Sequence, residues 1–356
     1  MATNLTAGLV GFAGAGKTTV FNLLTGQAVQ IAERAKTNVG MARVPDQRVD
    51  FLSALFKPKR TVYAQIQFSD VPGLVPDNRA AAAQFLSGVR DVDLLIYVLN
   101  SFGDDDCGDP LRDLIALSVE LLLVDMEVVE RRLERIRSGK KPTPQIEEER
   151  DILQRCLEAL EQEKRLDSLD LDPAERVLLR NFGFLTDKPV MAVVNLDEGQ
   201  MPGRSYRNKR ELTAFAGREG IPVVELCGRL EMEIGQLPPE DRAAFLADME
   251  IDESGIDRVA REAYRRLGLI SFFTVGEDEV KAWTITAGTP AVRAAGRIHS
   301  DIERGFIRAE VYHYNDLTEL GTVAALRDKG RFRLEGKEYL VQDGDIINFR
   351  FNVGKK

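Results

Sequence analysis

The sequence predicts an α/β protein in which a doubly wound, mostly parallel sheet is interrupted by a helical hairpin and followed by a small β-rich domain. Three observations support this fold class. Continuous apolar runs of strand length alternate with helical patterns, which is typical of a parallel sheet covered on both faces. Two amphipathic helical patterns in succession break that alternation. From about residue 270 onward, short β-rich runs are separated by glycine-containing turns.

The elements of the sheet domain follow from hydrophobic spacing and from helix-capping residues. Continuous apolar runs predict buried strands, and strict alternation of apolar and polar residues predicts a half-buried one. An aspartate before a helical pattern predicts a helix start, because its side chain accepts hydrogen bonds from first-turn amides. Strands are expected at residues 7–10, 62–68, 94–99 and 190–194, and helices at 17–25 and after Asp46.

A hairpin of two long helices is expected within this domain. Residues 110–137 carry apolar side chains every three or four positions, and a similar stripe follows the turn formers at 138–144. The domain boundaries that we expect are 1–109 and 182–268 for the sheet domain, 110–181 for the inserted hairpin and 269–356 for the C-terminal domain.

The composition excludes several classes of protein. A hydrophobic content of 44% supports folded cores, and no apolar run reaches the roughly 18 residues of a membrane-spanning helix. Two histidines and three scattered cysteines without a CxxC pair argue against a zinc site or a disulfide scaffold. The net charge of −9 argues against a general binder of nucleic acid, so any RNA contact must use local basic patches. We therefore expect a cytoplasmic protein without a membrane or DNA partner.

The clearest motif is a phosphate-binding loop. Gly11-Phe12-Ala13-Gly14-Ala15-Gly16-Lys17-Thr18 fits GxxxxGK[ST], directly after a strand and at the start of a helix. Small residues let backbone amides converge on phosphate oxygens, and the helix start adds its positive dipole end. The alternative is a glycine-rich turn with a chance lysine. The candidate phosphate-binding residues of this P-loop are Gly14, Ala15, Gly16, Lys17, Thr18 and Thr19.

Residues after the strand expected at 62–68 complete the phosphate site. Asp70 and the Thr18 hydroxyl are candidate ligands of Mg²⁺, because the carboxyl end of a parallel strand faces the same edge as the P-loop. The alternative for Asp70 is a turn residue before Pro72. Gly73 can bring its backbone amide close to a γ-phosphate without crowding. Lys17 and Gly73 are the catalytic candidates.

The base-recognition segment departs from the guanine-binding pattern Asn-Lys-x-Asp. Asn195-Leu196-Asp197-Glu198 has leucine in place of lysine and the longer glutamate in place of aspartate. A carboxylate accepts from the N1–H and the amino group of guanine, whereas adenine presents a bare N1 acceptor. The substitution weakens the guanine interpretation without establishing adenine. The candidate base-binding residues are Asn195, Leu196, Glu198 and Cys227.

Short motifs occur through the C-terminal domain and at two places before it. Asn38-Val39-Gly40 and Val44-Pro45-Asp46 follow the P-loop, and Asn-x-x-Glu stands at 195–198. Near the end are Phe273-Thr274-Val275-Gly276, Ala282-Trp283-Thr284-Ile285, Gly305-Phe306-Ile307-Arg308-Ala309-Glu310 and Gln342-Asp343-Gly344-Asp345. With these motifs the chain resembles the Obg-like ATPase family, of the ribosome-binding YchF type. These TRAFAC-class P-loop NTPases carry an OBG-type G domain, an inserted hairpin and a terminal β-grasp module, the TGS domain.

The resemblance implies a Mg²⁺-dependent P-loop ATPase that prefers ATP over GTP, hydrolyses slowly and binds the ribosome or a ribosomal subunit through rRNA contacts. Leu74 follows Gly73 where Ras-like enzymes place a water-orienting glutamine, which agrees with slow turnover. Two alternatives stay open: a nucleotide-sensing ribosome adaptor with negligible turnover, and a GTPase.

The chain departs from the family in its switch regions and in one loop. Arg34 stands at the expected first-switch threonine, and residues 75–83 lack the usual glycines, while four alanines there favour helix. Residues 227–229 differ from the family's small-residue loop. Six basic residues near the hairpin tip fit either an rRNA contact or a solvated helix end: Arg131, Arg132, Arg135, Arg137, Lys140 and Lys141. For His299 we expect a structural role.

Overall fold

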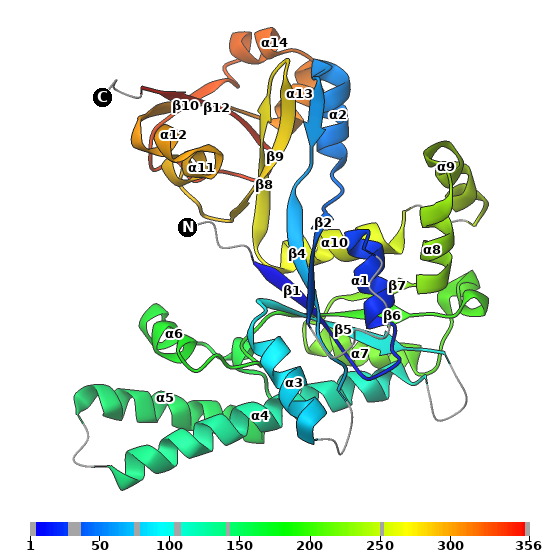
Figure 1. Ribbon diagram of the computed structural model, residues 1–356. Coiled ribbons are helices and arrows are strands. Elements are labelled where there is room, and N and C mark those ends of the chain that lie inside the picture. The colour runs from blue at the N-terminus through cyan, green and yellow to red at the C-terminus, as the bar shows by residue number, and fades with distance from the viewer. Residues whose placement is uncertain are drawn as a thin grey trace. The chain divides into compact units, whose positions relative to one another are not determined.

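The structure is a computed structural model that describes residues 5–27, 37–74, 79–102, 108–139, 143–249 and 253–352 (Figure 1). The chain forms two compact units. One, the sheet unit, comprises Thr6–Gly40 and Phe68–Val259. The other, the C-terminal unit, comprises Leu5, Met41–Gln67 and the residues from Ala260 onward. Arg34, residues 75–78, Cys107, Lys140 and Lys141 lie outside the described residues.

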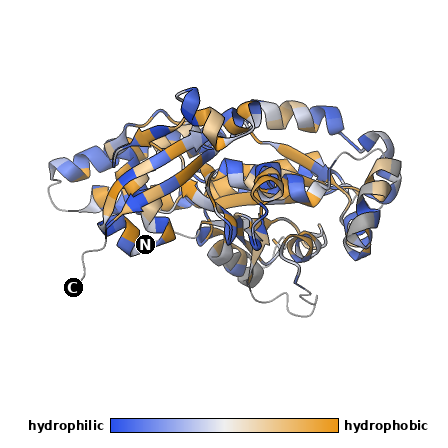
Figure 2. Cartoon of the chain, turned by 90° about the horizontal axis from the view of Figure 1, so that it is seen from above, coloured by the Kyte–Doolittle hydropathy of each residue, from blue (hydrophilic) through white to orange (hydrophobic). Residues whose placement is uncertain are grey.

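The sheet unit is built on a six-stranded sheet in the order β2-β4-β1-β5-β6-β7. β1 pairs parallel with β5, β5 with β6 and β6 with β7, which confirms the predicted fold class. β6 is buried along its whole length, which explains its continuous apolar sequence. Figure 2 shows hydrophobic residues concentrated in the strands. The strands are β1 (Thr6–Val10), β2 (Asn38–Arg43), β4 (Gln65–Asp70), β5 (Leu94–Asn100), β6 (Val190–Asn195) and β7 (Val223–Leu226).

Helix α2 begins where its capping residue, Asp46, predicts. Asp46 accepts from the Arg48 amide at 3.0 Å at the start of α2, and the helix favoured by the four alanines is present as α3. In the part of the chain that the structure describes, every helix is too short or too polar to cross a bilayer. Apart from the hairpin helices and those of the C-terminal β-rich segment, the longer helices are α1 (Lys17–Thr25), α2 (Gln47–Phe56), α3 (Arg79–Arg90), α7 (Lys209–Arg218), α8 (Gly228–Gln236), α9 (Pro239–Asp248) and α10 (Gly255–Arg266).

The predicted helical hairpin is present as α4 (Pro110–Ser138) and α5 (Pro144–Glu161), which run side by side in Figure 1. It has a hydrophobic core of its own, which includes Val129, Leu133 and Leu153. A further short helix, α6 (Pro173–Arg180), follows it and was not expected. Asp125 of α4 binds the backbone that leads back to the sheet, since it accepts from the Leu185 amide at 3.0 Å.

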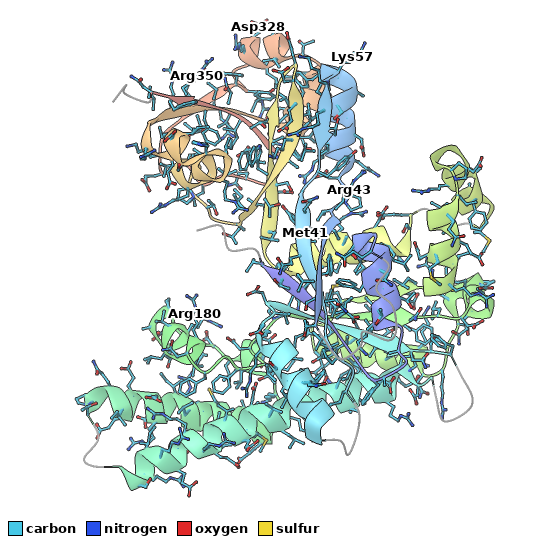
Figure 3. The ribbon with its side chains drawn as sticks, in the orientation of Figure 1. Met41, Arg43, Lys57, Arg180, Asp328 and Arg350 are labelled. Atoms are coloured by element: carbon cyan, nitrogen blue, oxygen red, sulfur yellow. The ribbon has the colours of Figure 1, made fainter. Side chains whose placement is uncertain are left out.

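The prediction of one strand at residues 62–68 is wrong. The segment divides into β3 (Arg60–Val62), which pairs parallel with β9 (Glu279–Thr286), and β4, which belongs to the other sheet. The local alternation could not show this division, because the partner of β3 lies more than 200 residues away. The Arg43 guanidinium lies over the Tyr63 ring at 3.3 Å (Figure 3).

The C-terminal unit has a six-stranded sheet in the order β11-β10-β12-β8-β9-β3. Arg350 of β12 pairs with Glu310 of β10 at 2.8 Å (Figure 3). Both histidines cap helices, as His299 accepts from the Asp301 amide and His313 from the Asn315 amide, each at 3.1 Å. His299 therefore has the structural role that we expected. The remaining strands are β8 (Leu269–Val275), β10 (Phe306–His313), β11 (Arg333–Glu335) and β12 (Asp345–Phe351), and the helices are α11 (Ala291–Ile298), α12 (Ser300–Arg304), α13 (Tyr314–Leu320) and α14 (Val323–Asp328).

Neither compact unit is one continuous segment of the chain. Residues 41–67 group with the C-terminal residues, because β3 joins their sheet and Arg48 Nη1 lies 2.8 Å from Asp343 Oδ2. The three-part division expected from the sequence, with a domain boundary between 268 and 269, stays a prediction.

Candidate functional site

The predicted phosphate loop connects β1 to α1. Gly14 and Gly16 have left-handed φ values of 87° and 94°, and no side chain caps the first turn of α1. Successive amides at a helix start attract an anion, particularly where the backbone can curl around it. All six predicted phosphate-binding residues, 14–19, lie on this loop and this first turn.

Lys17 folds back over the loop. Its Nζ donates to the Gly11 carbonyl at 3.1 Å and to the Phe12 carbonyl at 2.8 Å. The side chain is 7% exposed, so its charge is held close to the loop backbone. A cation in this position can neutralise a phosphate that binds to the loop amides.

Replacing Gly16 should damage this loop more than replacing Gly14. A Cβ at Gly16 would overlap the Asn195 amide nitrogen, whereas a Cβ at Gly14 would meet no atom within 4 Å. Both replacements by alanine carry the strain of a left-handed backbone, about 1–2 kcal/mol. Only Gly16→Ala also displaces Asn195, so we expect it to lower the melting temperature and the ATP affinity more than Gly14→Ala. Equal effects in thermal melts and calorimetry would contradict this reasoning.

Thr18 and Asp70 come together as the sequence predicted they could. The Thr18 hydroxyl donates to Asp70 Oδ2 at 2.8 Å, across 52 positions of the chain. Asp70 ends β4 and is 7% exposed. Among the described residues no group of three His, Cys, Asp or Glu side chains could hold a metal. A hydroxyl and a single carboxylate suit Mg²⁺, which usually keeps phosphate and water ligands.

Residues 71–74 run beside the phosphate loop. The Leu74 amide donates to the Gly11 carbonyl at 3.1 Å, and a Cβ at Gly73 would lie 2.9 Å from Lys17 Nζ. Gly73 therefore lies against the lysine, where only a residue without a side chain fits easily. Leu74 is 6% exposed and belongs to the hydrophobic core of the sheet unit.

Asn195 joins three segments of the sheet unit. Its Nδ2 donates to the Ala15 carbonyl at 3.2 Å, and its Oδ1 accepts from the Gly228 amide at 3.0 Å. It thereby links the phosphate loop, the end of β6 and the start of α8. This bridging role was not anticipated, and the predicted contact of Asn195 with a base is a separate hypothesis.

The base-recognition segment is held by polar contacts that sequence reasoning missed. Glu198 begins a short 3₁₀ turn, Glu198–Gln200. Gln200 Nε2 donates to the Ser101 carbonyl at 2.8 Å, and the Ser101 hydroxyl donates to the Asn195 carbonyl at 2.9 Å. The available signal was the position of Ser101 and Asn195, each a polar residue directly after or at the end of a buried strand.

The four predicted base-binding residues differ in exposure. Leu196 and Cys227 are each 2% exposed and belong to the hydrophobic core, and burial raises the pKa of the Cys227 thiol. Glu198 is 44% exposed and forms an ion pair with Arg229, with 2.7 Å between Oε1 and Nε. Little of either side chain is open to a ligand. Direct base contact by Leu196 or Cys227 stays a prediction.

The basic residues of the hairpin are partly neutralised. Arg131 pairs with Glu127, and Arg132 pairs with Glu149 at 2.6 Å. Of the described residues of the predicted patch, Arg131, Arg135 and Arg137 are exposed and Arg132 is half-buried.

Comparisons with known proteins find relatives that match nearly the whole chain. A "Ribosome-binding ATPase YchF" of Bacillus subtilis (strain 168) is 39% identical over 98% of this chain and 100% of its own length. The chain belongs to the YchF family. The YchF relatives of Haemophilus influenzae and Escherichia coli O157:H7 are 36% and 34% identical, each over 97% of this chain and 99% of their own length.

Family models and a solved structure match the same regions. Residues 6–129 match a family described as 50S ribosome-binding GTPase. Residues 269–352 match the YchF-GTPase_C family, described as a protein of unknown function (DUF933). The structure of the Schizosaccharomyces pombe YchF GTPase is 30% identical, covers 98% of both chains and superposes with a TM-score of 0.87. The YchF fold, with a P-loop domain and a C-terminal domain, is therefore the fold of this chain.

Proposed function

We propose that this chain is a Mg²⁺-dependent P-loop NTPase that slowly hydrolyses ATP to ADP and phosphate. We propose further that this hydrolysis is coupled to binding of the ribosome. The observation that carries the proposal is the joining of Lys17, Thr18 and Asp70 at one phosphate loop. The names of the bacterial YchF relatives support both the ATPase activity and the ribosome as partner.

In this proposal the phosphate chain lies along the amides of residues 14–19. Lys17 releases its two loop carbonyls and neutralises the β- and γ-phosphates, while the Gly73 amide donates to the γ-phosphate. These groups stabilise charge in the transition state and do not form covalent bonds to it. Mg²⁺ would be held by Thr18 and Asp70, whose oxygens already lie 2.8 Å apart, and would shield the phosphate charge.

Slow turnover follows from Leu74. Its side chain has no polar atom, and it is buried in the core, so it cannot orient an attacking water. We propose that the ribosome, or rRNA within it, supplies or completes the missing group. We assign Arg135 and Arg137, two of the exposed cations of the hairpin, to an rRNA contact, and the chain then acts in the cytoplasm, where ribosomes are.

Single-turnover hydrolysis of ATP, with and without ribosomes, tests the proposal. We expect slow phosphate release in magnesium buffer, faster release with ribosomes, and none above background when EDTA removes magnesium. No release beyond that of a Lys17→Ala variant under either condition would leave a nucleotide-sensing adaptor. In a competition assay, about tenfold tighter binding of GTP, or about 1.4 kcal/mol, would show a GTPase instead.

A further inference from the structure

We propose that Arg229 determines the base preference of this site, by forming with Glu198 an acceptor–donor pair that fits adenine. The inference rests on the proposed function, because it places the base at Glu198. Arg229 Nε lies 2.7 Å from Glu198 Oε1, and the two side chains are 74% and 44% exposed. Both side chains are therefore accessible to a ligand.

The main chain holds both partners of this pair in place. The residue before Arg229 is Gly228, whose amide donates to Asn195 Oδ1 at 3.0 Å. Glu198 follows Asp197, whose side chain accepts from the Gly199 amide at 3.1 Å. The short turn of Glu198 is also bound to the end of β5 through Gln200. Arg229 thus projects from the first turn of α8, which Asn195 anchors, and Glu198 projects from the 3₁₀ turn that follows Asn195.

The hydrogen-bonding groups of the pair match adenine better than guanine. Guanine presents N1–H and a 2-amino group side by side, so a carboxylate reads it with both oxygens. In this structure one of the two oxygens, Oε1, is already engaged by a guanidinium. Adenine presents a 6-amino donor beside the N1 acceptor. The second oxygen of Glu198 can accept from the amino group, and Arg229, which has only donors, can donate to N1.

Arg229 therefore supplies the hydrogen-bond donor for adenine N1 that a carboxylate alone lacks. Alone, Glu198 would set a negative oxygen against the N1 lone pair and leave both unpaired, which disfavours binding.

Calorimetric titration of Arg229→Ala with ATP, GTP and ITP, all in magnesium buffer, tests this assignment. We expect the ratio of ATP to GTP affinity to fall about tenfold, because a good bidentate contact discriminates between bases by about that factor or more. ITP lacks the 2-amino group. Wild type should bind GTP and ITP alike, whereas Arg229→Ala should prefer GTP, since both oxygens of Glu198 are then available.

A second variant and a control separate this role from simple loss of a cation. In the Arg229→Ala background, Glu198→Gln supplies an acceptor and a donor in one amide and should restore the preference for ATP. Arg218→Ala is the matched control. Arg218 is likewise an exposed arginine of the sheet unit that pairs with a glutamate, Glu219. It lies at the end of α7 and precedes the amino end of β7, whereas Arg229 follows the carboxyl end of that strand.

An unchanged ATP to GTP ratio in Arg229→Ala, or equal weakening of all three nucleotides, would overturn the inference. Those outcomes leave the proposed function intact as long as wild type binds and hydrolyses ATP. A wild type that binds no purine triphosphate would instead refute the proposed function, and the inference with it.

Discussion

Replacing Lys17 with alanine should reduce ATP hydrolysis by about 100- to 1,000-fold, because it removes the cation that stabilises charge on the transferred phosphoryl group. ATP binding should weaken as well. The fold should be retained with a loss of about 1–3 kcal/mol in stability, since the change deletes hydrogen bonds to the loop carbonyls of Gly11 and Phe12. Phosphate release under single-turnover conditions and a thermal melt measure the two effects.

Lys188 offers a matched control for this variant. Its Nζ also donates to backbone carbonyls, those of Val89, Arg90 and Val92, at 2.7–2.8 Å. It lies just before β6, at the amino ends of the parallel strands, whereas the phosphate loop follows the carboxyl end of β1. Lys188→Ala should therefore lower stability, by about 1–3 kcal/mol, and leave ATP hydrolysis intact. Loss of hydrolysis in both variants would indicate a general folding defect and contradict the role of Lys17.

Replacing Asp125 with alanine should give the largest loss of stability, about 3 kcal/mol or more. Asp125 is 1% exposed and accepts three hydrogen bonds, from the Leu185 amide at 3.0 Å, the Thr186 amide at 2.8 Å and the Thr186 hydroxyl at 2.7 Å. Burial raises the pKa of this carboxyl, and the three donors oppose that rise. Without the side chain, all three donors are left buried and unpaired.

Hydrogen exchange shows where the stability is lost, because a chain of two units need not unfold in one step. In Asp125→Ala the amides of residues 185 and 186 and of α4 should exchange faster. Asp125→Asn keeps an acceptor oxygen, so its exchange rates should lie between those of the wild type and those of Asp125→Ala. The control is Asp151→Ala on α5, an aspartate that is 69% exposed and should change stability by less than about 0.5 kcal/mol. A similar loss in Asp151→Ala would refute the role of burial.

The features that could be predicted from the sequence are those that neighbouring residues control. The phosphate loop, the start of α2 at Asp46 and the hairpin of α4 and α5 depend on residue types a few positions apart, and the structure contains each of them. The meeting of Thr18 with Asp70 was also predictable, because parallel strands bring their carboxyl ends to one edge.

Other features required the folded chain. The separation of β3 from β4 and the grouping of residues 41–67 with the C-terminal unit depend on a strand partner at residues 279–286. The same holds for Asn195, whose amide joins residues 15 and 228, and for the ion pair of Glu198 with Arg229. None of these pairings has a local signature, because a strand edge or a side-chain amide can bond to any suitable group.

By itself, then, the sequence determined the fold class, the phosphate loop, the helices α1 and α2 and the helical hairpin, since apolar spacing and capping groups act within a few residues. Only the tertiary structure decided how far Leu196 and Cys227 are buried and which side chain meets Glu198. Burial and long-range pairing depend on how distant segments pack together, and that packing selects among contacts which the local sequence allows equally.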